Sequence, residues 1–261
     1  MKSNSSKWAL ILGGSSGLGL ATAQKLGRNG YNLFILHRDR RSELQTIEKE
    51  FNSIRSFGIQ LYAFNADALN PAKMQEVVQS ISEVLGDSKL GVLVHSIAKG
   101  NLKPLKSEGG PTLNTSDFQH TIHAMGISLY DWTKTILNSN LFAKDARIIA
   151  FTSEGSSKAW EGYAAVSAAK ATLESIVRSM ALEFAPVGLR VNCIQAGITE
   201  TRSFQMIPKS DKLKEQAKKR NPFGRLTTPE DVADVVYLLT LEEARWINGT
   251  VIKADGGESL R

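Results

Sequence analysis

The stretch Leu10–Ala21 reads LILGGSSGLGLA and places a glycine-rich turn between an apolar run and an amphipathic one. Glycines permit a tight strand-to-helix turn, and the N-terminus of the helix that follows offers free N–H groups to a pyrophosphate. A glycine cluster alone is weak evidence, but in the first unit of a repeating strand–helix pattern it predicts a dinucleotide site. The residues expected to contact the dinucleotide here are Gly13, Ser15, Ser16, Gly17, Leu18 and Gly19.

The rest of the chain repeats the alternation of short apolar runs with longer amphipathic ones, which predicts βα units and a parallel sheet. Strands are expected near Trp8–Leu12, Leu33–Leu36, Gln60–Phe64, Val92–His95, Ile148–Thr152, Arg190–Ile194 and Thr250–Lys253. Helices are expected near Gly17–Arg28, Ser42–Ser56, Pro71–Leu85, Asp117–Asn138, Tyr163–Phe184 and Pro229–Leu241. The fold class is therefore α/β, a Rossmann-type doubly wound parallel sheet of about seven strands with helices on both faces and ligands at the carboxyl ends of the strands.

The bulk composition is that of one globular domain spanning residues 1–261, with 42% hydrophobic and 22% charged residues. No apolar run approaches the roughly 18 residues of a membrane span, and the N-terminal run leads straight into the glycine turn, unlike a signal peptide. The single Cys193 fits a reducing cytoplasm. Although the net charge is +6, the basic residues are scattered without a nucleic-acid motif, so we expect no nucleic-acid partner. No cluster has metal-ligand spacing.

The second strand ends in FILHRDRR, Phe34–Arg41, and this tip predicts which dinucleotide binds. An acidic residue at such a tip binds the ribose 2′-hydroxyl of NAD, whereas an Arg accommodates the 2′-phosphate of NADP. The tip carries His37 and Arg38, which favours NADPH. Asp39 is expected to fall where the chain has already turned into the next helix, and Arg40 and Arg41 are equally compatible with a solvated helix start.

The stretch Ile198–Arg225 is expected to be irregular and too long for a simple connection, which indicates a substrate-binding lid over residues 198–225. It contains Pro208 and Pro222 and several basic residues. These could steer an acidic partner toward the site or form a solvated helix face. They are Lys209, Lys212, Lys214, Lys218, Lys219 and Arg220.

The run GYAAVSAAK, Gly162–Lys170, holds the candidate catalytic pair. Tyr163 and Lys170 lie seven positions apart, close to two helical turns at roughly 3.6 residues per turn, so both side chains face the same way. Lys170 is flanked by alanines in an otherwise small and apolar face, where a solvated lysine is not expected. Ser153 precedes Lys170 by seventeen positions.

These motifs resemble the short-chain dehydrogenase/reductase superfamily, whose ordinary members place the Tyr four positions before the Lys, here Val166. The wider offset, HSIA at 95–98, the segment RVNCIQAGITET and the terminal ADGG are similar to enoyl-acyl-carrier-protein reductases, most closely the NADPH-using type III branch. The resemblance implies that Tyr163 binds the substrate thioester carbonyl and Lys170 the nicotinamide ribose. It further implies that Ser153 assists the oxyanion or orients Tyr163, and that His123 replaces a helix Asn of a proton relay.

The same resemblance implies further cofactor contacts and partners. The contacts are Ala66, Asp67, Ala68, Ser96, Ile97, Ala98, Gly197, the Ile198 backbone and the Thr201 hydroxyl. Asp67 could instead be a helix N-cap, and His95 a hydrogen-bonded residue at a strand end. Implied partners are an acyl carrier protein or acyl thioester and further copies of the chain in a homotetramer, packed through the helices around Asp117–Asn138 and Tyr163–Phe184.

The expected function is NADPH-dependent reduction of the trans-2 double bond of an enoyl-acyl-carrier-protein or enoyl-CoA thioester in fatty acid biosynthesis. In such a reduction hydride reaches the β-carbon while charge develops on the thioester oxygen two bonds away, so the oxyanion donor should stand further from the nicotinamide than in a ketone reductase. A cation beside the Tyr163 phenol would favour its ionised form. The alternatives are a carbonyl or 3-oxoacyl thioester reductase and a non-catalytic NADPH-binding regulatory protein.

Overall fold

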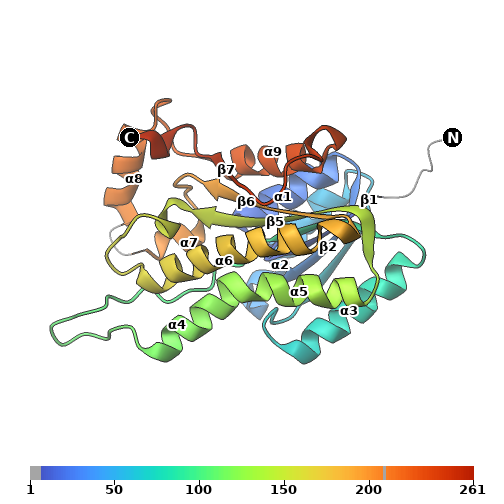
Figure 1. Ribbon diagram of the computed structural model, residues 1–261, viewed down its shortest axis with the longest axis horizontal. Helices are drawn as coiled ribbons and strands as arrows, with labels where there is room; N and C mark the ends of the chain where they lie inside the picture. Colours follow the sequence, from blue (N-terminus) through green and yellow to red (C-terminus); the bar gives the residue numbers. More distant parts are fainter. Residues whose placement is uncertain (1–6, 208–209) are drawn as a thin grey trace.

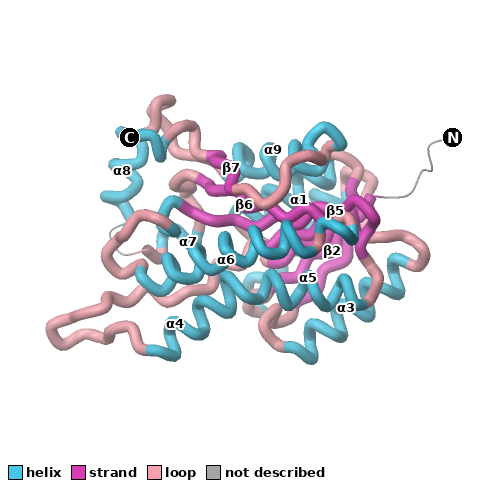
Figure 2. The backbone as a smooth tube through the Cα atoms, viewed as in Figure 1, coloured by secondary structure: helices cyan, strands magenta, loops and turns pink. Residues whose placement is uncertain are grey.

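The computed structural model describes residues 7–207 and 210–261, and within them seven parallel strands form a single sheet (Figures 1 and 2). The strand order is β3-β2-β1-β4-β5-β6-β7, so the chain reverses direction across the sheet between β1 and β4. The strands are β1 Lys7–Leu12, β2 Tyr31–His37, β3 Leu61–Asn65, β4 Leu90–His95, β5 Phe142–Ser153, β6 Leu189–Ala196 and β7 Val251–Ala254. The predicted doubly wound α/β sheet is confirmed.

Helices cover both faces of the sheet. In Figure 1, α1 and α9 lie above the sheet and α3 and α5 below it, and α2 shares the core of α1 and α9 while α6 shares that of α3 and α5. The helices are α1 Gly17–Arg28, α2 Leu44–Arg55, α3 Pro71–Leu85, α4 Thr115–Ile122, α5 Ser128–Asn138, α6 Ala164–Glu183, α7 Arg202–Gln205, α8 Ser210–Arg220 and α9 Pro229–Thr240.

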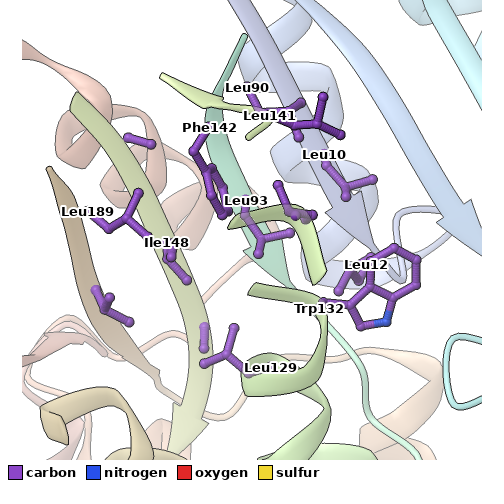
Figure 3. Close-up of a cluster of buried hydrophobic side chains, with 14 of the residues drawn as sticks. Leu10, Leu12, Leu90, Leu93, Leu129, Trp132, Leu141, Phe142, Ile148 and Leu189 are labelled. Carbon is purple, nitrogen blue, oxygen red and sulfur yellow. The ribbon is translucent and has the colours of Figure 1, made fainter. Parts of the chain in front are cut away.

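Strand residues alternate between two apolar cores, one on each face. Leu10 and Leu12 of β1 join the core around Trp132, whereas Ala9 and Ile11 join the opposite one. Figure 3 shows Leu10, Leu12 and Trp132 together in the first of these cores. Burial on both faces explains the continuous apolar runs in the strand sequences, and each large side chain so buried stabilises the fold by about 1.5–3 kcal/mol.

The helix expected over Asp117–Asn138 was only partly correct. The structure divides it into α4 and α5, joined by a π-helical turn over His123–Ile127. Gly126 lies in this turn, and a Cβ there would be 3.2 Å from the carbonyl oxygen of Ala169 in α6. The widened turn therefore accompanies a close approach of α6, a tertiary contact that helical periodicity does not report.

The expectation of an irregular stretch over residues 198–225 was wrong, because it contains α7 and α8. The Thr201 hydroxyl caps α7 by accepting a hydrogen bond from the Phe204 N–H at 3.2 Å. The α8 sequence SDKLKEQAKKR is rich in Lys, Gln and Glu, which are strong helix formers. Pro208 and Lys209 lie outside the described residues.

The contact between the start of α1 and the glycine turn leaves no space for a side chain. A Cβ on Gly19 would lie 2.1 Å from the carbonyl oxygen of Gly13, so this helix packs against the turn through backbone atoms alone.

Replacing Gly19 with Ala is expected to lower the free energy of unfolding by about 1–3 kcal/mol, because the added methyl forces α1 off the turn. Urea denaturation of the variant and the wild type measures the difference. Gly91→Ala is the matched control, since the nearest atom to its Cβ, the carbonyl oxygen of Trp8, is 3.8 Å away; it should change the same free energy by less than about 0.5 kcal/mol. Equal effects of the two changes would contradict the steric argument.

Candidate active site

A cavity of about 550 Å³ opens at the carboxyl ends of β1, β2, β4, β5 and β6. This edge is where a doubly wound sheet binds ligands, because the loops diverge on either side of the reversal in strand order. The cavity is lined by almost all of the residues expected from the sequence. They are Gly13, Ser15, Ser16, Gly17, Leu18, His37, Arg38, Ala66, Asp67, Ala68, Ser96, Ile97, Ala98, Ser153, Tyr163, Lys170, Gly197, Ile198 and Thr201. Gly19 does not line the cavity and instead packs against the backbone of Gly13.

The glycine turn is held between the ends of β2 and β4. Gly13 donates its N–H to the Leu36 carbonyl oxygen at 2.7 Å, and Ser96 donates to the Leu12 carbonyl oxygen at 2.8 Å. Gly13 has a φ of +85°, and a Cβ there would lie 2.4 Å from the Ser96 carbonyl oxygen. Ser16 precedes α1, and its side chain makes no capping hydrogen bond to the first turn. The backbone N–H groups of that turn can therefore bind a pyrophosphate.

At the tip of β2 the structure corrects the expected place of Asp39. This residue does not lie in the next helix but in the cavity lining, two residues before the 3-10 turn Arg41–Glu43. The Asn65 side chain fixes it there, accepting from its N–H and donating to its carbonyl oxygen, both at 3.2 Å. The Asp39 carboxylate is 2.8 Å from Nδ1 of the buried His37.

Arg38 points across the cavity mouth to Asp67, with 2.5 Å between Nη1 and Oδ2. Lys99, which sequence reasoning did not identify, approaches the same carboxylate at 3.9 Å. Burial opposes ionisation of Asp67, but the Leu69 N–H and these two cations together hold its pKa below the ordinary value. Asp67 is therefore not the cap of α3, a role that Asn70 fills.

The catalytic candidates meet on the opposite side of the cavity. Tyr163 precedes the first turn of α6, and its Oη is 3.4 Å from Ser153 Oγ at the end of β5. Val166, one turn further along, also lines the cavity, which confirms that the two positions share a face. Burial raises the pKa of Tyr163 above its ordinary value of 10. The expectation of a favoured phenolate was wrong in this structure, because desolvation outweighs every other influence on the phenol.

Lys170 is buried at the base of the cavity and donates from Nζ to the Phe151 carbonyl oxygen at 2.6 Å. Burial lowers its pKa to about 8. An ammonium has three protons, so this bond leaves others free for a ligand hydroxyl.

His95 and His123, which the sequence analysis considered as possible functional residues, do not line this cavity. Nε2 of the buried His95 is 2.8 Å from Ser128 Oγ, so this residue is the hydrogen-bonded strand-end histidine of the simpler interpretation. Burial, assisted by the Lys170 charge, lowers the pKa of His95 to about 3. His123 is half-buried in the π-helical turn, 3.2 Å from Asp131, and does not line this cavity but a smaller pocket next to it.

The cavity continues into an apolar end that the sequence did not reveal. It is formed by Leu102, Met125, Trp160, Phe204, Ile207 and Leu213. The Trp160 ring packs against Tyr163 at 5.1 Å between centroids. Leu213 belongs to α8 and Phe204 to α7, so the segment over residues 198–225 contributes apolar side chains to the cavity lining. Thr199 and Glu258 also line the cavity and were not anticipated.

Some kinds of site are absent from residues 7–207 and 210–261. No helix in these ranges is long and apolar enough to cross a membrane. Nor does any group of three or more His, Cys, Asp or Glu side chains in the same ranges have the arrangement of a metal site.

Comparison with known proteins places this geometry among nicotinamide-dependent oxidoreductases. The family model described as enoyl-(acyl carrier protein) reductase matches residues 13–259. The short chain dehydrogenase of Penicillium thymicola is 30% identical over 260 residues, covering 96% of this chain and 91% of that protein. The crystal structure of the enoyl-[acyl-carrier-protein] reductase (NADH) of Aquifex aeolicus is 28% identical, with a TM-score of 0.85 over 98% of this chain and 97% of that one. A short chain dehydrogenase of Burkholderia cenocepacia in complex with NADP, 24% identical over 97% and 98% of the two chains, has the same fold with a TM-score of 0.80.

Replacing Lys170 with Met is expected to stabilise the cofactor-free fold at pH 7. The pKa of about 8, against an ordinary 10.5, means that burying the ammonium costs about 3 kcal/mol, whereas the Phe151 carbonyl that loses its partner costs about 1 kcal/mol. The variant should therefore gain about 1–2 kcal/mol in free energy of unfolding.

The pH dependence of the free energy of unfolding tests whether the Lys170 charge is destabilising. Between pH 8 and 10.5 the unfolded wild type binds more protons than the folded one, so wild-type stability rises with pH and the advantage of Lys170→Met shrinks. Urea denaturation at pH 7 and pH 10 measures this change, with the exposed Lys219→Met as a control that should show no such trend. A variant less stable by the same amount at both pH values would contradict a buried, strained charge.

Proposed function

The chain belongs to the enoyl-(acyl carrier protein) reductase family of the short-chain dehydrogenase/reductase superfamily, and we propose that it uses NADPH to reduce the trans-2 double bond of an enoyl-acyl-carrier-protein or enoyl-CoA thioester in fatty acid biosynthesis. The observation that carries this proposal is the position of Tyr163. Its phenol lies in the cavity beside Ser153, one turn of α6 before the Val166 position of ordinary superfamily members.

The residues present fit a nicotinamide dinucleotide. Gly13 and Gly17 leave the backbone open at the start of α1, with φ values of +85° and +54°. The first-turn N–H groups of α1 would hold the pyrophosphate, and Lys170 would hold the nicotinamide ribose through its remaining protons. The cofactor would supply the hydride.

The substrate oxygen would be served by Tyr163. When a hydride adds to the β-carbon of an enoyl thioester, the electron pair of the double bond moves toward the carbonyl and charge develops on its oxygen. Because burial keeps the Tyr163 phenol protonated, its O–H can donate to that oxygen as the charge grows. Ser153 would orient the phenol at 3.4 Å. A proton then reaches the α-carbon from solvent or from Tyr163, which completes the saturated thioester.

Preference for NADPH is supported by the tip of β2. One carboxylate oxygen of Asp39, Oδ2, is paired with His37 Nδ1 at 2.8 Å, which leaves it less available to a ribose hydroxyl. Arg38 is within reach of the cavity and can exchange Asp67 for a 2′-phosphate, because Lys99 also faces that carboxylate. The Aquifex aeolicus relative bears NADH in its name, so the proposed preference for NADPH rests on these side chains alone.

Two partners follow from this proposal. Three lysines of α8 have no carboxylate closer than 3.7 Å among the described residues and could steer an acyl carrier protein toward the cavity; they are Lys212, Lys218 and Lys219. Lys214 is held by Glu200 at 2.6 Å and is not available in the same way. Leu182 and Trp246 are more than three-quarters exposed, which supports assembly with further copies of the chain as a homotetramer.

A carbonyl or 3-oxoacyl thioester reductase is the second candidate function. The Ser153–Tyr163 pair favours it, because a hydroxyl pair in the same cavity as a buried lysine can also protonate a ketone oxygen. It would require the acceptor carbonyl to lie beside the displaced phenol. Comparing acetoacetyl and crotonyl thioesters with the same enzyme separates the two functions.

Replacing Tyr163 with Phe is expected to lower kcat for crotonyl-CoA reduction by about 10²–10³-fold, because the substrate oxygen loses its donor. The oxidation of NADPH followed at its absorbance maximum gives the rate. The dissociation constant for NADPH should change less than about threefold, since the ribose is held by Lys170.

Tyr62→Phe is the matched control, because that side chain is exposed on β3 and, among the described residues, its hydroxyl bonds only Gln60 at 3.3 Å. It should leave kcat unchanged. Undiminished turnover by the Tyr163 variant, or no enoyl turnover by the wild type, would refute the proposed reaction.

Replacing Arg38 with Gln is expected to weaken NADPH binding about tenfold or more, because one charge-assisted contact to the 2′-phosphate is lost, while NADH binding changes less than about twofold. Fluorescence titration with each cofactor measures both. Arg40→Gln removes the same charge two residues further on. Because Arg40 is exposed at the start of the next turn, this change should alter neither the NADPH nor the NADH affinity. An equal loss of NADH and NADPH affinity in the Arg38 variant would mean that its role is structural.

A further inference from the structure

Arg220, the last residue of α8, joins two buried carboxylates from chain segments far apart in the sequence. Its Nη1 is 3.0 Å from Glu154 Oε2 and its Nη2 is 2.7 Å from Glu258 Oε1. Glu154 and Glu258 are 8% and 3% exposed, and both line the cavity. Carboxylates this deeply buried are stable in their ionised form only when paired, so the guanidinium cannot leave either of them without cost.

The Glu154 side of this bridge leads to the proposed oxyanion donors. Glu154 follows Ser153 directly and begins the 3-10 turn Glu154–Ser156. Lys158 approaches its other carboxylate oxygen at 2.5 Å. Because Ser153 Oγ faces the Tyr163 phenol at 3.4 Å, any displacement of the Glu154 turn moves the partner of that phenol.

The Glu258 side leads to the segment around Gly197 and Ile198, which is expected to contact the cofactor. Glu258 Oε2 accepts the Ile198 N–H at 3.0 Å, so this amide already has a hydrogen-bond partner. The same bond ties the backbone of the segment to the Glu258 side chain. A Cβ on Gly197 would lie 2.9 Å from the same oxygen, which shows how closely the carboxylate packs under the backbone.

The turn that carries Glu258 is itself attached to the end of α8. Asp255 accepts the N–H groups of Gly257 and Ser259 at 2.9 and 3.1 Å, and positive φ values at the glycines 256 and 257 reverse the chain. Asn221, the residue after Arg220, donates to the Asp255 carbonyl oxygen at 3.0 Å. Figure 1 shows α8 beside this C-terminal turn. Two consecutive side chains thus bind the turn, one to its backbone and one to Glu258.

We propose that Arg220 is a positioning residue that couples the cofactor side of the cavity to its substrate side. Binding of the cofactor against residues 197–199 fixes Glu258, Glu258 fixes Arg220, and Arg220 fixes both the Glu154 turn and the α8 wall that presents Leu213 to the apolar end. The oxidised or reduced dinucleotide therefore orders the thioester site before the thioester arrives. The part that concerns the thioester depends on the proposed function; the part that concerns α8 does not.

The charge balance makes this role specific to Arg220 among the basic residues of α8. The two carboxylates face Arg220 and Lys158, so the cluster is neutral as a unit. Burial raises the pKa of Glu258, with the neighbouring Glu154 acting in the same direction. Removing Arg220 leaves two close buried carboxylates with one cation, whereas removing Lys219 leaves the cluster intact.

Hydrogen exchange of residues 210–220 with and without NADP⁺ tests the coupling to α8. In the wild type, saturating NADP⁺ should slow exchange of this segment, and Lys219→Met should behave alike. Arg220→Met should bind NADP⁺ within about threefold of the wild-type affinity but show no slowing. Full slowing in the Arg220 variant, or none in the wild type, would overturn the proposal.

Binding of butyryl-CoA by calorimetry tests the coupling to the substrate side. NADP⁺ should tighten wild-type binding about tenfold, and less than about twofold in Arg220→Met, with partial recovery in Arg220→Lys, which can reach one carboxylate. A wild type that binds no butyryl-CoA would count against the proposed reaction, and hydrogen exchange then decides the role of Arg220 by itself. If Arg220→Met fails to fold, the double variant Arg220→Met/Glu258→Gln restores the charge balance without the bridge and must show the same losses; retained coupling there would refute the proposal.

Discussion

The backbone contact between the glycine turn after β1 and the chain leaving β4 determines where the site can form. Gly13 approaches the Ser96 carbonyl so closely that any side chain would collide with it, and Gly19 seats α1 against the same turn. This contact lies at the reversal of strand order, so it brings the first-turn N–H groups of α1 next to the ends of β4 and β5. Residues expected to bind the cofactor, mostly from the first half of the chain, and the catalytic candidates from the second half then share one cavity.

Within that frame, the site concentrates polar groups that destabilise the fold. Lys170 is buried with one backbone acceptor, and its pKa falls to about 8 because desolvation disfavours the charged form. Tyr163 is buried in the same cavity, and desolvation holds its phenol protonated. The two effects are complementary for reduction, since a cation can hold a ribose while a neutral phenol has a proton to donate. Strained groups of this kind are common at sites where function opposes stability.

The sequence predicted what local patterns encode and missed what distant contacts create. The glycine turn and the paired faces of Tyr163 and Lys170 follow from spacing, so the sheet and the cavity lining could be anticipated. The helices α7 and α8 could not be anticipated from the irregular appearance of the segment 198–225, and the place of Asp39 depends on Asn65, twenty-six positions away. Glu258 gave no signal at all, because its role requires a C-terminal turn to fold back under Ile198. Contacts between residues so distant in sequence leave no periodicity.

The position of Tyr163 and the Arg220 bridge both bear on how an oxyanion donor and an acyl chain are held relative to the nicotinamide. Conjugate reduction separates the carbon that receives hydride from the oxygen that receives charge, so the donor must be held at a fixed distance from the nicotinamide while the acyl chain lies between them. In the proposed reaction, Tyr163 would meet the first condition by its position at the start of α6. The second needs a wall whose place depends on the cofactor, and α8 is joined to the cofactor side through Arg220 and Glu258. A ketone reductase, in which hydride and proton reach adjacent atoms, would have less need of such a connection, and the bridge is therefore more readily explained by an enoyl substrate than by a carbonyl one.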